Sequence, residues 1–362
     1  MADGMIYKTS QEAEQMKRET EDKGSVGMSP VTGEKQPMVL VGGPITEYKI
    51  YCTAQFMTGI KKMSYKNKVI VLVDNSPTDA IREAISRLKI DCPFYILTTP
   101  NRAYARQRLV EGRNLLRDIM LKKKDLSSYE LSVEDEKKTR ELQEMDFDYF
   151  FSIEQDVVPP IDVVEQLLGN EKDIIEAVYF NSKKLPNNSI TIIPMAWNWA
   201  DPQVKELELL IDCPMEFLLP SRIFSVAAIG LGCCLMKKEV LERMENVTNV
   251  LDKFNKVDGK TEEELKKQIE GKLQGITDEL KICTPGADIQ IDYKNIEVNG
   301  IGISVPSKII SKGFRYDKSK YACDDMFFSL DTSKMGYDLY INSYLWCNHY
   351  HQQWDIQQVG ER

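Results

Sequence analysis

The sequence predicts an α/β protein with a mostly parallel central sheet that helices flank. Strand-like and helix-like segments alternate from residue 38 onward, which is the order typical of a parallel sheet. The strand-like segments are almost continuously apolar, as expected for strands that are buried on both faces. One of them, residues 146–153, ends abruptly in Glu154 and Asp156, and a double proline then stops it. Open α/β sheets bind ligands at the carboxyl ends of their strands, so this strand end is the first candidate site.

The two carboxylates at this strand end are suited to a hard divalent cation. Carboxylate oxygens are preferred ligands of Mg²⁺ and Mn²⁺, which complete their coordination with water and substrate phosphates. Ordinary loop acids also occur at many strand ends. From this segment alone, both interpretations of Glu154 and Asp156 stay open.

Three further strands are expected before the acidic one, because three apolar runs are bounded by turn residues. The first run leads into a Gly-Gly-Pro turn. The predicted strands are residues 38–44, 69–73 and 94–97.

Helices are expected between these strands. The first covers about 46–60. The second starts after Ser76, which caps it, with Asp79 completing a capping box. The third is long and ends at about Lys123, and the charged segment 124–143 after it is expected to be a surface excursion.

Residues 246–313 are predicted to be an insertion that contains one helix and a pair of strands. Thr261 begins a capping box. The strands are expected at 289–293 and 296–303 because apolar and polar residues alternate there. The apolar residues that follow Thr261 share one helical face and are Leu265, Ile269, Leu273 and Leu280.

Composition limits the possible functions. The net charge of −9 and the pI of about 5.1 argue against a broad nucleic-acid groove, which needs clustered positive charge. No apolar run reaches the length of a membrane span. The eight cysteines contain no Cys-x-x-Cys pair, which favours a reduced, cytoplasmic compartment. The polar residues 1–36 predict a flexible arm and argue against a signal peptide.

Two common nucleotide-binding motifs are missing. The first strand is not followed by a Gly-x-Gly-x-x-Gly turn, and the chain has no Walker-type phosphate loop. A dinucleotide-dependent dehydrogenase and a P-loop kinase are therefore disfavoured.

Several separated motifs together resemble the GT-A fold glycosyltransferases of the broad family-2-like, inverting type, which use nucleotide sugars. The resemblance extends from about residue 38 to 351 with a large gap, and each motif is short. The motifs are VLVDNSPTD at 71–79, EGRN at 111–114, EQD at 154–156, AIGLGCCLMKKEVL at 228–241, CDDMFF at 323–328, GYDLY at 336–340 and CNH at 347–349.

The resemblance implies a Rossmann-like GT-A core with a metal site at the EQD motif. Asp156 would bind Mn²⁺ or Mg²⁺, and His349 would be a second ligand from the protein. Glu154 replaces the usual first Asp of this motif, so it would lie on the metal or nearer the ribose or sugar. His351 is an alternative to His349 as the ligand.

The resemblance also assigns residues to the nucleotide-sugar donor. Asp74 would contact the base or ribose, although it is also compatible with an ordinary turn acid. Arg113 would meet phosphate, although helix arginines are often solvated. Asn114 and Gly232 would complete the donor site. Trp197, Trp199 and Trp346 are weaker candidates for sugar platforms, because aromatic rings are more often part of a core.

Catalysis is assigned to the acid pair of CDDMFF. Asp325 would be the base that takes the acceptor proton, and Asp324 would bind the acceptor or orient Asp325. The pair is also compatible with helix N-terminal acids that the macrodipole favours.

The resulting expectation is a metal-dependent glycosyltransferase of the hexosyltransferase type, most consistent with a UDP-sugar donor. The acceptor would be a glycan, a protein or a modified nucleic-acid base, and the oligomeric state is open. The expected organisation is a core at 37–245, the insertion, and a C-terminal part of the core at 314–362. A sugar-phosphate nucleotidyltransferase, a non-catalytic binding protein and a retaining transferase stay as alternatives.

Overall fold

The computed structural model describes residues 36–350, apart from 185–187, 202, 205, 219–221, 255–256 and 318–322. The flexible arm predicted for 1–36 therefore lies outside the described residues except for Gln36, and so does His351. The chain from Pro37 onward forms one compact unit.

An eight-stranded sheet organises this unit in the order β11-β17-β6-β13-β4-β1-β2-β3. Six strands run in one direction, and β13 and β11 run against them. The predicted mostly parallel sheet is confirmed. Its strands are β1 (Val39–Ile45), β2 (Lys68–Asp74), β3 (Phe94–Thr98), β4 (Tyr149–Ile153), β6 (Ile174–Val178), β11 (Ile223–Val226), β13 (Cys233–Lys237) and β17 (Leu339–Trp346).

Helices cover both faces of this sheet, so its central strands are buried on both sides, as their apolar sequences require. Alternate residues of β1 enter opposite cores. One face packs against α4 (Ala105–Met120), α5 (Val133–Gln143), α7 (Lys238–Arg243) and α10 (Asp324–Lys334). The other face packs against α2 (Thr53–Lys62), α3 (Ala80–Ser86) and α6 (Val163–Leu168).

Short elements connect these layers. Small sheets pair β5 (Val157–Val158) with β18 (Asn348–His349), β7 (Phe180–Lys184) with β8 (Ile190–Pro194), and β9 (Ala196–Trp199) with β10 (Leu210–Asp212) and β12 (Ala228–Ile229). The 3₁₀ helices are η1 (Glu47–Cys52), η2 (Ser127–Tyr129), η3 (Leu207–Leu209) and η4 (Met215–Leu218). No helix in the described ranges has both the length and the apolar character needed to cross a membrane.

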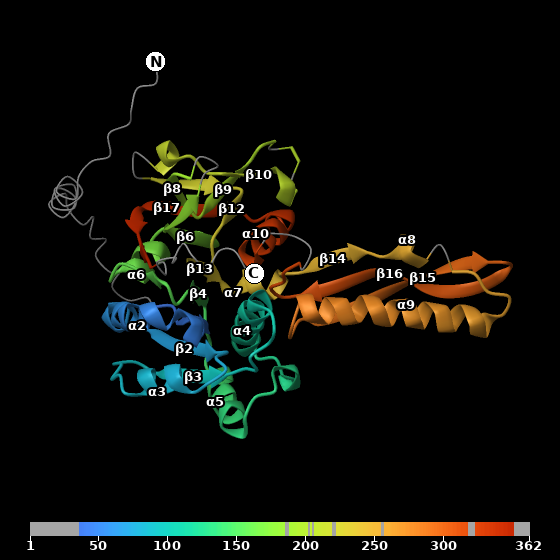
Figure 1. The fold of residues 1–362 in the computed structure, drawn as a ribbon, viewed down its shortest axis with the longest axis horizontal. Coiled ribbons are helices and arrows are strands. Elements are labelled where there is room, and N and C mark those ends of the chain that lie inside the picture. The colour runs from blue at the N-terminus through green and yellow to red at the C-terminus, as the bar shows by residue number, and fades with distance from the viewer. Residues whose placement is uncertain are drawn as a thin grey trace, which may run out of the picture. The chain divides into compact units, whose positions relative to one another are not determined.

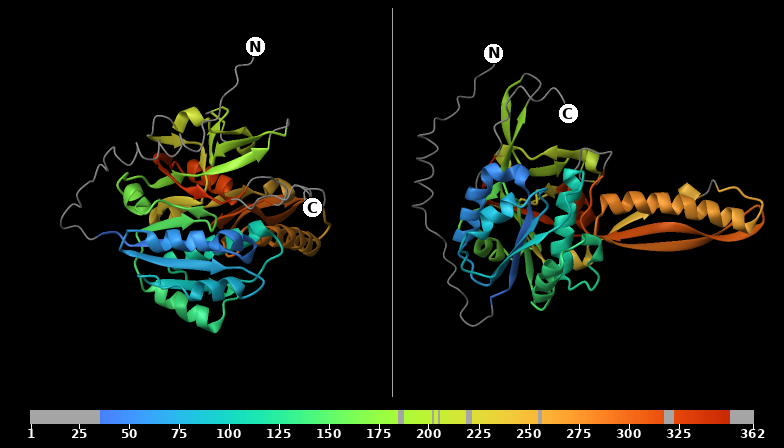
Figure 2. Two further views of the ribbon diagram at one scale, coloured as in Figure 1. Left: turned by 60° about the vertical axis from the view of Figure 1, so that its left-hand side comes forward. Right: turned by 60° about the horizontal axis from the view of Figure 1, so that its bottom comes forward.

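The predicted insertion folds as a helix against its own sheet. Figures 1 and 2 show α9 (Glu262–Cys283) running beside β15 (Asp288–Val298) and β16 (Ile301–Lys312), away from the large sheet. These elements, with β14 (Asn246–Asn249) and α8 (Leu251–Phe254), enclose a separate apolar cluster. The Thr261 side chain accepts from Glu264 N, which confirms the predicted helix start. We call β14–β16 with α8 and α9 the arm.

The predicted strand boundaries in the arm are wrong. The expected strand 296–303 spans a hairpin turn at Asn299 and Gly300, both of which have positive φ. An Asn-Gly pair between alternating apolar residues is a strong signal for this turn, and the pattern of apolar residues alone did not reveal it.

Two other local predictions differ from the structure. Asp79, not Ser76, is the N-cap residue of α3, and its side chain makes no capping hydrogen bond. Ser76 Oγ instead accepts from Glu47 N (2.8 Å). The segment 124–143 is more than the expected surface excursion, because it contains helix α5, in which the Ser132 side chain accepts from Asp135 N and Leu142 is buried.

The helix predicted for 46–60 is interrupted. It consists of η1 followed by α2, with non-helical backbone angles at Lys49 (φ −108°, ψ 24°). This interruption leaves the η1 segment near the carboxyl end of β1.

Close packing between β1 and β4 depends on glycine. A Cβ atom at Gly43 would overlap the carbonyl oxygen of Ile153, the last residue of β4. This contact involves the backbone of a central strand, so it cannot be relieved by turning a side chain.

We expect Gly43→Ala to lower the free energy of unfolding by ~1–3 kcal/mol, the usual cost of overpacking. Gly271 lies in α9 with open space around its Cβ position, so Gly271→Ala should instead stabilise the chain by up to ~1 kcal/mol. Urea unfolding of both variants checks the pair. Similar effects of the two changes would contradict the packing described for Gly43.

Candidate functional site

Chain topology brings the acidic motif and the C-terminal segment together at the carboxyl edge of the large sheet. Glu154 and Asp156 directly follow β4, which is parallel to β1. Strand β18 pairs with β5, and this places His349 opposite Val157. The backbone N–H of Tyr350 also donates to Asp156 O (2.8 Å). Residues almost 200 positions apart therefore share one site.

Asp156 lies between two basic side chains. Its Oδ2 is 2.8 Å from Lys49 Nζ and 3.5 Å from His349 Nε2. Burial raises the pKa of Asp156, but the hydrogen bond with His349 and the charge of Lys49 outweigh it and hold the pKa well below its ordinary value. Asp156 is therefore a carboxylate at neutral pH.

The His349 ring is held in a fixed orientation. Its Nδ1 is 2.5 Å from the Phe180 carbonyl oxygen, and its ring meets Tyr179 edge-on at 5.3 Å between centroids. Because a carbonyl oxygen only accepts, Nδ1 carries a proton, and Nε2 is the nitrogen that faces Asp156. Burial lowers the pKa of His349, but the hydrogen bond and charge of Asp156 raise it more, so the net shift is upward.

Asp156 and His349 fit the role of partial ligands for a divalent ion. The Asp156 Oδ1 atom is buried and has no hydrogen-bond partner, which leaves it available. The contact between His349 and a carbonyl oxygen is the outer contact typical of ligating histidines. Within the described residues, no group of three or more His, Cys, Asp or Glu side chains is arranged around a metal position. Mg²⁺-type sites commonly take one or two protein ligands together with substrate phosphates, so a pair is sufficient.

Arg113 joins the acidic motif to helix α10. Its side chain is fully buried, and its Nη2 donates to Glu154 Oε1 (2.6 Å) while its Nη1 donates to Asp324 Oδ2. The sequence predicts a phosphate contact for Arg113 and metal or ribose contacts for Glu154, and these roles stay predictions. In the structure, both side chains are engaged with each other.

The two acids of the α10 start differ in environment. Asp324 is buried and paired with Arg113. Asp325 is half-buried, and its Oδ1 accepts from Met326 N (2.7 Å). Burial, and then the charges of Asp324 and Glu154, raise the pKa of Asp325 to about 7. A carboxyl group with a pKa near neutral is suited to take and return a proton.

The other predicted donor residues occupy separate positions. Asp74 is buried at the end of β2, where its Oδ1 accepts from Ser76 N and its Oδ2 lies 3.2 Å from Arg82 Nε. Burial is the main cause that raises the pKa of Asp74. A base or ribose contact for Asp74 stays a prediction.

Asn114 lies at the base of the arm. Its Nδ2 donates to Pro285 O (2.7 Å) and Phe314 O (3.0 Å), and its Oδ1 accepts from Phe314 N (2.7 Å). These bonds tie the segment after α9 and the segment after β16 to α4. A donor contact for Asn114 stays a prediction.

Gly232 and Gly230 surround the ring of Tyr179. A Cβ atom at Gly232 would lie 2.7 Å from Tyr179 Cζ, and Gly232 N donates to the Tyr179 hydroxyl (3.1 Å). The Tyr179 side chain thus occupies the space next to both glycines, and a donor contact for Gly232 stays a prediction. Tyr179 connects this loop to His349.

The tryptophans proposed as sugar platforms differ in exposure. Trp197 is buried in the core, and Trp199 is partly buried. Trp346 is about half exposed and packs against Phe180, with ring centroids 5.0 Å apart. A sugar contact by any of them stays a prediction.

Sequence reasoning missed three residues of this site. Gln155 connects both ends of η1 to the acidic motif. Its Oε1 accepts from Thr46 N (2.8 Å), and its Nε2 donates to Thr53 Oγ1 (2.8 Å). Lys49 contacts Asp156 but lies in η1, in a segment that carries no motif. Glu176 is fully buried in β6, and burial raises its pKa well above the ordinary range. An acid inside the apolar run 174–178 is the signal that could have revealed Glu176.

Comparisons with known proteins give structural likeness only. No protein-family model and no curated protein matches the chain. A crystal structure of GalNAc-T7 with UDP, GalNAc and Mn²⁺ is similar at 10% identity and a TM-score of 0.43, over 89% of this chain and 45% of that one. A crystal structure of TarS from S. aureus in complex with UDP is similar at 8% identity and a TM-score of 0.31, over 57% of this chain and 48% of that one. The chain thus spans about half the length of these solved structures.

We expect Arg113→Met to lower the free energy of unfolding by ~3–5 kcal/mol, because it leaves two acids without their buried partner. Arg140 forms an exposed pair with Glu136 in α5 (3.2 Å; 77% of the Arg140 side chain is exposed). Arg140→Met should therefore cost less than ~0.5 kcal/mol. Chemical denaturation of the two variants measures both values. A small loss of stability in Arg113→Met would show that the pairing of Arg113 with the two acids does not hold the site together.

Proposed function

We propose that this chain is a GT-A-type glycosyltransferase that moves a sugar from a nucleotide-diphosphate donor to an acceptor hydroxyl. The observation that carries the proposal is one connected set of side chains. Asp156, with a free buried oxygen, lies two residues from Glu154, which Arg113 links to Asp324 beside Asp325. A carboxylate suited to a cation and a carboxyl group suited to proton transfer thus belong to the same network. The order of sequence motifs along the chain is a second support.

The chemistry of glycosyl transfer needs these two functions. Positive charge develops at the sugar carbon while negative charge develops on the departing diphosphate. A divalent ion held by Asp156 and His349 would neutralise the diphosphate, an effect worth several kcal/mol. Asp325 would accept the proton of the acceptor hydroxyl, with Asp324 fixed behind it by Arg113. Direct attack with Asp325 as base would invert the sugar carbon.

Donor, acceptor and compartment are also proposals. We infer a UDP-sugar donor, a hexosyl group and Mn²⁺ or Mg²⁺ from the resemblance of the motifs. A glycan or protein acceptor agrees better with the net charge of −9 than a nucleic-acid base does. The eight cysteines contain no Cys-x-x-Cys pair, and this supports a cytoplasmic location.

Nucleotide binding provides the primary test. We expect UDP with Mn²⁺ to stabilise the full chain against heat, by ~2.7 kcal/mol at 100 times the dissociation constant. GDP, CMP and dTDP, each with and without Mn²⁺, complete the panel. Asp156→Ala should lose the stabilisation, whereas Asp162→Ala, at an exposed position six residues away, should keep it. Absence of a shift with every nucleotide would contradict the transferase proposal.

The pKa of Asp325 predicts how turnover depends on pH. Below pH about 7 the carboxyl group keeps its proton and cannot accept another, so kcat/KM should rise as the pH passes through about 7. Asp325→Asn should abolish turnover. Asp338→Asn, at an exposed position after the end of α10, should keep both the rate and its pH dependence. Full turnover by Asp325→Asn would exclude this residue as the base.

A further inference from the structure

Lys49 places a positive charge at the proposed ion site. Its Nζ lies 2.8 Å from Asp156 Oδ2, the same oxygen that His349 Nε2 approaches at 3.5 Å. About a third of the Lys49 side chain is exposed, compared with a tenth of Asp156. The ammonium group therefore reaches solvent from a position beside a nearly buried carboxylate.

Hydrogen bonds hold the backbone of Lys49 in place. Its carbonyl oxygen accepts from Cys52 Sγ (3.0 Å), and Gln155 Nε2 donates to it (3.3 Å). Gln155 lies between the two acids of the EQD motif, so its hydrogen bonds hold the segment that carries Lys49 next to these acids. Only the flexible lysine side chain can move without breaking these contacts.

A divalent ion on Asp156 Oδ1, the oxygen without a hydrogen-bond partner, would lie beside the Lys49 ammonium group on Oδ2. Mn²⁺- or Mg²⁺-type ions bind carboxylate oxygens at about 2.0–2.2 Å, and the ammonium group already lies within 2.8 Å of one oxygen. Like charges at such separations repel strongly where water is scarce. An ion bound to Asp156 would therefore favour movement of the lysine side chain toward another anion.

The donor's diphosphate is the anion that the proposed function brings to this position. We propose that Lys49 is a donor-binding residue that neutralises Asp156 before the ion binds and then pairs with the diphosphate of the nucleotide. This inference rests on the proposed function, and it adds a cationic residue that the motif resemblance does not assign. Lysine suits this role because it is a compact charge on a flexible stem.

The proposal predicts two opposite effects of one substitution. Lys49→Met removes the competitor for Asp156, so Mn²⁺ should bind the nucleotide-free chain more tightly, by about tenfold. The same change removes a partner of the diphosphate, so UDP should bind the Mn²⁺-loaded chain more weakly, again by about tenfold. A merely structural lysine would not move these affinities in opposite directions.

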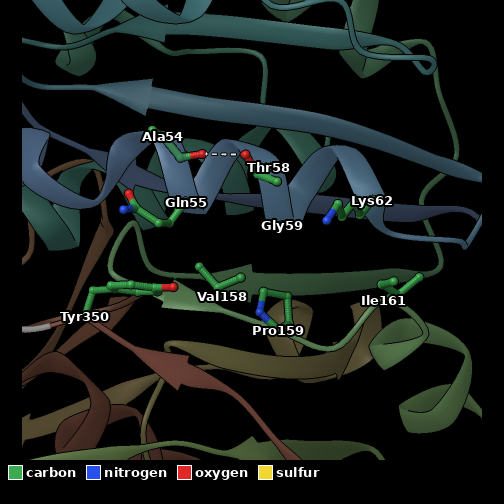
Figure 3. A pocket seen from close by; sticks show the side chains of 9 residues that line it. All are labelled: Ala54, Gln55, Thr58, Gly59, Lys62, Val158, Pro159, Ile161 and Tyr350. Carbon is green, nitrogen blue, oxygen red and sulfur yellow. Dashed lines mark hydrogen bonds between the residues drawn. The ribbon is translucent and has the colours of Figure 1, made fainter.

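The closing experiment uses two titrations of the full chain. In the first, Mn²⁺ is added alone, and electron paramagnetic resonance measures the free Mn²⁺. In the second, UDP is added at saturating Mn²⁺, and calorimetry measures its binding. Lys49→Arg keeps the positive charge and should stay close to the unchanged chain in both titrations. Lys62→Met is the matched control: this exposed lysine of α2 lines a separate cavity of about 430 Å³, beside Val158 and Pro159, and no carboxylate is among the lining residues (Figure 3). It should change neither affinity.

Each outcome decides a defined part of the proposal. Tighter Mn²⁺ binding with weaker UDP binding in Lys49→Met supports it. Unchanged or weaker Mn²⁺ binding in Lys49→Met, when its circular dichroism and Tm match the unchanged chain, overturns the proposal. If Lys49→Met has lost its fold, Lys49→Gln takes its place, and unchanged Mn²⁺ binding in Lys49→Gln overturns the proposal. If Mn²⁺ binds Lys49→Met more tightly but no variant binds UDP, the contact with Asp156 stands, while the diphosphate role and the nucleotide-dependent function both fail.

Discussion

The buried guanidinium group of Arg113 is the contact on which the site depends. It connects the end of a central strand to the start of α10, two elements separated by more than 150 residues along the chain. Removing a charged group from water is costly unless hydrogen-bonded partners of opposite charge replace the water. The two acids therefore have to stay close to Arg113, and the relative position of the strand end and the helix start is fixed by this requirement.

The same electrostatic requirement divides the acids of the site into two kinds. Glu154 and Asp324 share Arg113, and Asp156 has Lys49 and His349. For Asp156, these basic partners hold the pKa well below its ordinary value. Asp325 and Glu176 instead lie where burial raises the pKa, so they favour the protonated form. Neighbouring carboxyl groups with different protonation states are the usual arrangement for combining charge stabilisation with proton transfer.

Helix α4 links this site to the arm. Arg113 faces the acids, and the next residue, Asn114, holds Pro285 and Phe314 at the root of the arm. Lys123, just beyond the end of α4, adds an ion pair to Asp288 at the start of β15 (2.8 Å). Adjacent positions on one helix therefore serve the site and the arm.

The amino-acid sequence by itself determined the main elements. Nearly continuous apolar runs predicted β1, β2, β3 and β4. Strands such as β1, β2 and β4 are buried on both faces and need apolar residues at nearly every position, whereas β3 is the edge strand and is mostly only partly buried. The Thr261 pattern predicted the start of α9, because capping depends only on residues three positions apart. The same local reasoning failed at Ser76, where a tertiary contact with Glu47 takes the hydroxyl group.

The position of Glu154 and Asp156 at a strand end also followed from the sequence, since it depends only on where the apolar run stops. The partners of these acids did not. Lys49, Arg113 and His349 come from three segments that lie far apart in the sequence, with no spacing that relates them. Only the tertiary structure decided which base meets which acid, because the free energy of a buried charge depends on what surrounds it in space and not on its neighbours along the chain.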